Sequence, residues 1–217
     1  MVIIRLISFI PLRVLYLFSD FLFFVAFYLI GYRRQIVSKN LKHAFPEKDK
    51  AELKKIERLF YLNLADTSME TLKGLTISNR SILQRVNIDT SLVDDITMQG
   101  KPVLIMTSHF CNWEWMLLAY CVRSHVDVHA VYHRLRNPFF DRLMLQTRSR
   151  FGCIMHDKDT VVADMGKMPY KPYVMAMVGD QRPFSGERKY WAPFMNQDAA
   201  FYSGTELLAR RLDIPVL

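Results

Sequence analysis

Cysteine is scarce, and its pattern excludes two classes of small stabilised protein. The three residues, Cys111, Cys121 and Cys153, are odd in number and have no CxxC spacing. They therefore indicate neither a disulfide framework nor a thiolate zinc site, and they fit a reducing compartment. Internal repeats, low-complexity tracts and a linker that would divide the chain are also missing from the sequence. A length of 217 residues then predicts one main domain.

The sequence also lacks the marks of a nucleic-acid-binding protein. It has no zinc-finger spacing, no RNP-like segment and no dense basic helix. The net charge is nevertheless +8. This charge favours a different anionic partner, such as an acidic membrane surface, an acidic carrier protein or an acidic substrate. We therefore expect no nucleic-acid partner.

A long apolar run near the N-terminus predicts membrane attachment. Residues 14–30, VLYLFSDFLFFVAFYLI, carry Asp20 as their only charge, and no small-residue cleavage site follows them. As a helix this run would be about 26 Å long, close to the hydrocarbon thickness of about 30 Å. We predict that residues 1–35 anchor the chain in the membrane. A segment that lies in the membrane interface and a buried core helix stay open as alternatives.

Basic residues follow the apolar run directly. By the positive-inside rule they place the remaining domain, residues 36–217, on the cytoplasmic side of the membrane. The residues concerned are Arg33, Arg34, Lys39 and Lys42.

Beyond residue 100, short apolar strands alternate with helices. Alternation of this kind predicts an α/β fold, with a mostly parallel sheet flanked by helices. Strands are expected at 102–107, 126–132 and 173–178, and helices at 47–74, 112–122, 137–150 and 203–212. The last four residues, IPVL, indicate a strand that is only beginning. We therefore expect the chain to stop short of a complete domain at its C-terminal end.

The segment SHFCNWEW (108–115) carries the clearest chemistry. His109 lies two residues beyond the first predicted strand, and Glu114 falls in the first turn of the next helix. In open parallel sheets, ligands bind beyond the carboxyl ends of the strands. A carboxylate there can fix the tautomer of the imidazole, which then acts as a general base on a hydroxyl. The spacing alone also suits an ordinary loop-to-helix junction, and Cys111 leaves a covalent Cys–His route open.

Four motifs occur in order along the chain: SHFCNWEW, NPFFDRLMLQTRSRFG, GDQRP and APFMNQDAAFYSGTELLAR. Together they resemble the lysophospholipid-acyltransferase-like family that performs late acylation of lipid A, from about residue 38 to the end. The resemblance implies a transferase at the cell inner membrane whose catalytic domain faces the cytoplasm. The donor would be an acyl-acyl carrier protein, the acceptor a hydroxyl of a lipid A precursor, and no cofactor would be needed.

The resemblance also implies roles for individual residues. His109 and Glu114 would form the catalytic dyad, in which Glu114 orients the imidazole. The substrate-binding residues would be Arg148, Arg150, Asp180 and Gln181, with the two arginines near a phosphate or the developing oxyanion. A later match marks a glycine-containing helix start at Gly204, Thr205 and Arg210.

Other functions stay open beside this one. The same chemistry would serve another glycolipid or an amino-acid lipid, and a non-catalytic membrane adaptor for acidic partners would show the same charge. A metal site is not expected. His125, His129 and His133 recur every four residues, but on a strand neighbouring members lie about 13 Å apart, too far for one ion.

Overall fold

Parallel strands form the centre of the C-terminal half of the protein. In the computed structural model, which describes residues 2–168 and 171–217, these strands form a four-stranded sheet in the order β1-β4-β2-β3. Every neighbouring pair is parallel. The strands are β1 (Val103–Thr107), β2 (Asp127–Tyr132), β3 (Ile154–Asp157) and β4 (Tyr173–Val178). The predicted α/β fold is confirmed. The sequence analysis predicted β1, β2 and β4 but not β3, whose four residues are too few to give a clear apolar pattern.

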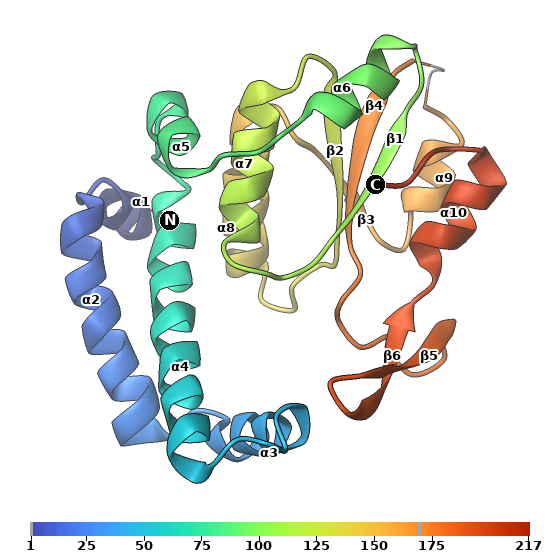
Figure 1. Cartoon of the computed structure of the whole chain (residues 1–217). Coiled ribbons are helices and arrows are strands. Elements are labelled where there is room, and N and C mark those ends of the chain that lie inside the picture. Colours follow the sequence, from blue (N-terminus) through green and yellow to red (C-terminus); the bar gives the residue numbers. More distant parts are fainter. Residues whose placement is uncertain (1, 169–170) are drawn as a thin grey trace.

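Helices cover both faces of this sheet, because successive side chains of a strand point to opposite sides. Val103 and Val174 pack on the side of α6 and α7. Their neighbours Leu104 and Met175 pack on the side of α9 and α10. Figure 1 shows α7 and α10 on opposite sides of the sheet. The helices of this half are α6 (Ser91–Met98), α7 (Trp113–Arg123), α8 (Pro138–Arg148), α9 (Val161–Met165) and α10 (Gly204–Leu212), and a 3-10 turn, η2 (Ser149–Phe151), follows α8.

The N-terminal half is helical. Asp49 starts its longest helix with a capping box, in which Asp49 and Glu52 each accept a hydrogen bond from the other's backbone N–H. The apolar run forms α2 and continues into η1, which is a π-helix. The elements are α1 (Val2–Ser8), α2 (Leu12–Phe24), η1 (Val25–Ile30), α3 (Arg34–Ala44), α4 (Lys50–Lys73) and α5 (Asn79–Arg85). The long helix predicted at 47–74 is therefore confirmed as α4.

One side of α2 and η1 lies along α4 (Figure 1), where Phe23 and Phe27 pack on Tyr61. Leu12–Ile30 spans 19 residues with a mean hydropathy of 1.8, so its length and composition would allow it to cross a membrane. A core helix can pass the same test, but only 22% of this helix is buried within the protein. Whether the helix spans the membrane or lies in its interface stays a prediction, as does the division at residues 35 and 36.

Two further features lie toward the C-terminal end. An antiparallel hairpin, β5 (Lys189–Phe194) and β6 (Gln197–Tyr202), lies away from the main sheet and was not predicted. The final residues run beside β1, as the apolar IPVL segment indicated. Leu217 N–H donates to the Leu104 carbonyl over 2.9 Å, and Val216 forms an isolated parallel bridge with Leu104.

Candidate active site

His109 and Asp180 meet at the carboxyl edge of the sheet. β1 and β4 are neighbours, and their register pairs Thr107 with Val178. A backbone hydrogen bond of 3.1 Å from Gly179 N–H to the Thr107 carbonyl extends this pairing by one residue. His109 and Asp180 each lie two residues beyond a paired strand end. The strand order therefore brings together two side chains that are 71 positions apart in the sequence.

Asp180 holds His109 at two points. One carboxylate oxygen lies 2.6 Å from His109 Nδ1, and the other accepts the His109 backbone N–H over 2.9 Å. An ionised carboxylate can only accept, so a neutral imidazole in this position donates from Nδ1 and has its lone pair on Nε2. The amide nitrogen of Gln181 lies 3.3 Å from Nε2, in position to donate to it. The His109 and Asp180 side chains are 29% and 36% exposed, so an incoming molecule can reach them.

Glu114 is engaged elsewhere. Its carboxylate accepts two hydrogen bonds from Arg148, at 2.5 and 2.9 Å, in a forked ion pair. Burial disfavours the Arg148 charge, but the hydrogen bonds to Glu114 and the negative charge of Glu114 act against it, and the pKa of Arg148 is raised. Among the described residues, no hydrogen bond joins Glu114 to His109. In this structure the carboxylate beside Nδ1 is that of Asp180, and the catalytic pairing of Glu114 with His109 stays a prediction.

The whole chain, residues 1–217, matches the family model of the bacterial lipid A biosynthesis acyltransferases. The chain belongs to this family. Membership confirms the resemblance seen in the sequence, and it implies an acyltransferase that uses an acyl donor and a lipid A acceptor. Together with the apolar helix Leu12–Ile30, it indicates that this acyltransferase associates with a membrane. No curated protein matches the chain.

Trp113 connects the His109–Asp180 pair with the Glu114–Arg148 pair. Its ring packs edge-on against the His109 ring, with centroids 4.8 Å apart, and its indole N–H donates to Glu114 over 3.2 Å. The Glu114–Arg148 pair thus supports the imidazole indirectly, through an aromatic side chain. No local pattern in the sequence signals this link.

Glu70 of α4 anchors the loop that carries His109, and the sequence analysis missed it. Asn112, the N-cap residue of α7, donates its amide to the Glu70 carboxylate over 2.6 Å. The indole of Trp115 donates to the Glu70 carbonyl over 2.8 Å. A glutamate on a charged helix carries no distinguishing local pattern, so only the tertiary fold reveals this contact.

The remaining predicted residues make contacts other than with His109. Arg150 donates to the Gly74 carbonyl over 2.6 Å, at the junction of α4 with η2. Gly204 and Thr205 begin α10 as expected, and Arg210 pairs with Glu206 of the same helix over 3.4 Å. Within the part of the chain that the structure describes, no hydrogen bond links any of them to His109 or Asp180.

Two histidines lie beside one another on the neighbouring strands β2 and β3. His129 Nδ1 is 2.9 Å from His156 Nε2, and His156 Nδ1 is 3.3 Å from the Asp164 carboxylate. Burial, and then the neighbouring His156, lower the pKa of His129 to about 4. The described residues contain no cluster of three metal-ligating side chains.

Proposed function

We propose that this chain transfers a fatty acyl group from an acyl carrier protein thioester to a hydroxyl of a lipid A precursor. The observation that carries the proposal is the imidazole of His109, held through Nδ1 by Asp180 at the carboxyl edge of β1 and β4. A basic nitrogen with a fixed tautomer and an accessible position is what acyl transfer to a hydroxyl requires. The family supplies the substrate class.

In the proposed reaction, His109 Nε2 takes the proton from the acceptor hydroxyl as its oxygen attacks the thioester carbonyl. Gln181 lies beside Nε2 and turns away when the hydroxyl binds. Collapse of the tetrahedral intermediate forms the ester and breaks the carbon–sulfur bond. The leaving carrier thiolate then takes the proton from the imidazolium, which returns His109 to its starting state.

In this mechanism Asp180 is the residue that orients His109 and stabilises the imidazolium. The dyad that the motif implied, His109 with Glu114, then works in a different way: Glu114 fixes Trp113, which packs on His109. Arg148 is already paired with Glu114. We therefore assign the stabilisation of the oxyanion to backbone amides at the start of α7.

The charge and the apolar helix fit the proposed substrates. A net charge of +8 favours an acidic carrier protein and an anionic lipid surface. The exposed side of Leu12–Ile30 would keep the protein where a lipid acceptor lies, at the inner membrane with the sheet on the cytoplasmic side.

The test is the rate of acyl transfer by the purified full chain, measured with an acyl carrier protein thioester and a lipid A precursor. His109→Ala should lower this rate by about 10²–10⁴. The control is His125→Ala, which removes a partly exposed histidine that precedes β2 and pairs with Asp94 over 3.3 Å. A folded His109→Ala variant with an unchanged rate would exclude His109 as the general base. Absence of transfer by the original chain would favour a non-catalytic adaptor.

A further inference from the structure

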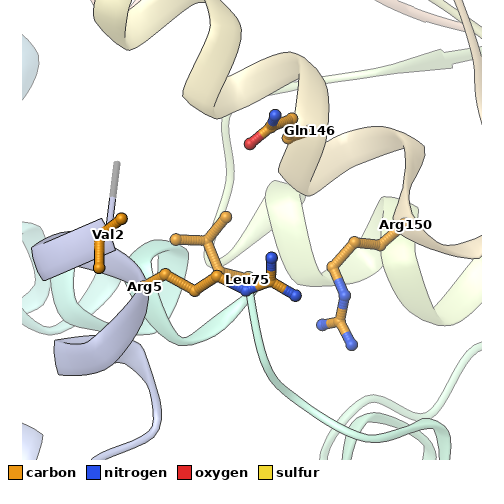
Figure 2. Close-up of a pocket in the computed structure, with 5 residues that line it drawn as sticks. All are labelled: Val2, Arg5, Leu75, Gln146 and Arg150. Carbon is orange, nitrogen blue, oxygen red and sulfur yellow. The ribbon is translucent and has the colours of Figure 1, made fainter.

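Two arginines, Arg5 and Arg150, face one cavity beside the N-terminal helix. The cavity has a volume of about 390 Å³ and is lined by Val2, Arg5, Leu75, Gln146 and Arg150. Figure 2 shows the Arg5 and Arg150 side chains extending toward one another from opposite sides. Neither arginine takes part in the arginine ion pairs of the described residues.

The Arg150 guanidinium contacts the protein and still has N–H donors available for a ligand. Its guanidinium donates to the Gly74 carbonyl and lies 4.8 Å from the centre of the Phe151 ring. A guanidinium has five N–H donors, so most of them remain available. Burial, and then the nearby positive charge of Arg5, lower the pKa of Arg150. An anion placed between the two guanidinium groups would relieve this repulsion.

The helix that carries Arg5 is fixed against α4. Lys73 donates to the carbonyls of Ser8 and Ile10 over 2.9 and 3.0 Å, and Thr76 donates to that of Ser8 as well. These bonds occupy carbonyls at the C-terminal end of α1. The position of the α1 backbone therefore does not depend on a bound ligand.

The surface beside the cavity is apolar. Val2 and Ile3 of α1 are each 73% exposed, and Leu6 is 62% exposed. α1 leads through Pro11 directly into the apolar helix that begins at Leu12. Exposed aliphatic side chains next to two guanidinium groups match the two parts of a phospholipid, its acyl chains and its headgroup phosphate.

We propose that Arg5 and Arg150 together bind the headgroup phosphate of an anionic membrane phospholipid whose acyl chains lie along the exposed side of α1. Guanidinium groups bind phosphate oxygens through paired hydrogen bonds, and two of them converge on this cavity. Gln146 supplies a further polar group at the rim. The site does not rest on acyl transfer, since none of its lining residues contacts His109 through a described hydrogen bond.

The test uses the purified full chain in micelles of an uncharged detergent, doped with phosphatidylglycerol. A lipid that binds the folded state raises the melting temperature, which gives an apparent dissociation constant. Arg5→Lys and Arg150→Lys keep the charge but lose the paired geometry, and each should weaken this binding by about fivefold. Arg142→Lys, an exposed arginine of α8 outside the cavity, is the matched control and should bind like the original chain.

Equal binding by all three lysine variants would overturn the proposal, because non-specific attraction depends on charge alone. Arg5→Lys is informative even if Arg150→Lys impairs folding, since the described hydrogen bonds include none from the Arg5 side chain. Inorganic phosphate at constant ionic strength separates the two sources of the ligand. A lipid site predicts little stabilisation by free phosphate, and stabilisation equal to that by the lipid would contradict it.

Discussion

Replacing Asp180 by Asn tests which carboxylate serves His109. Asp180 accepts two hydrogen bonds from this residue, at 2.6 Å from the ring and 2.9 Å from the backbone. An amide of the same shape can accept through its oxygen only, and it has no charge to stabilise an imidazolium. Hydrogen bonds to a charged group are worth about 1.5–3 kcal/mol each. Since Asp180 is 36% exposed, water screens it, and we expect a loss of about 2 kcal/mol.

That loss corresponds to a rate about 30-fold lower. The assay is steady-state acyl transfer by the purified chain. We expect kcat to fall while KM changes little, because Asp180 acts on the imidazole and not on the substrates. Asp180→Asn should also melt cooperatively and close to the original temperature, since the pair lies at the surface. A folded Asp180→Asn variant with at least half of the original kcat would refute the reasoning.

The remaining predictions concern the stability of the fold and the alternative route in which the Cys111 thiol is the nucleophile. Glu114→Gln leaves the Arg148 charge without its partner, so calorimetry in detergent should find the free energy of unfolding lower by about 3–5 kcal/mol, and replacing both residues by apolar ones should recover part of it. Cys111→Ser should keep the transfer rate within about twofold, because the proposed route needs no thiol, and loss of the rate would restore the Cys–His route. His129 is neutral in the folded protein down to a pH of about 4. In the unfolded chain the same imidazole binds its proton already at about pH 6.5. The free energy of unfolding should therefore fall by up to about 3 kcal/mol as the pH is lowered from about 6.5 to about 4. Melting temperatures measured across this range should fall less steeply for His129→Gln, and an unchanged slope would contradict the assignment.

The sequence was sufficient to predict three of the four strands of the main sheet but not the order of the strands. Apolar runs predicted β1, β2 and β4 within one residue, and the helix expected at 137–150 forms as α8. Which strand lies beside β1 depends on long-range packing, and no local pattern encodes it. The pairing of β1 with β4 brings Asp180 to His109.

The partner of Glu114 was unpredictable for a related reason. A spacing of five residues placed its carboxylate in the first turn of α7, near His109 in sequence. Arg148 arrives there from the end of α8 and makes a closer, two-pronged contact with a carboxylate that is 5% exposed. An arginine fork outcompetes a single imidazole bond for a buried carboxylate. Sequence proximity therefore could not reveal that Glu114 pairs with Arg148, and the roles of His109 and Glu114 in catalysis stay predictions.

The most direct test of the central claim is mass spectrometry of lipid A from cells that lack this gene. Each culture carries either the original gene or the His109→Ala variant, at matched protein levels. We predict one secondary acyl chain more on lipid A with the original gene than with the variant. Identical lipid A in both cultures would contradict the proposed acceptor, and a mass change confined to another lipid would assign the same chemistry to that lipid.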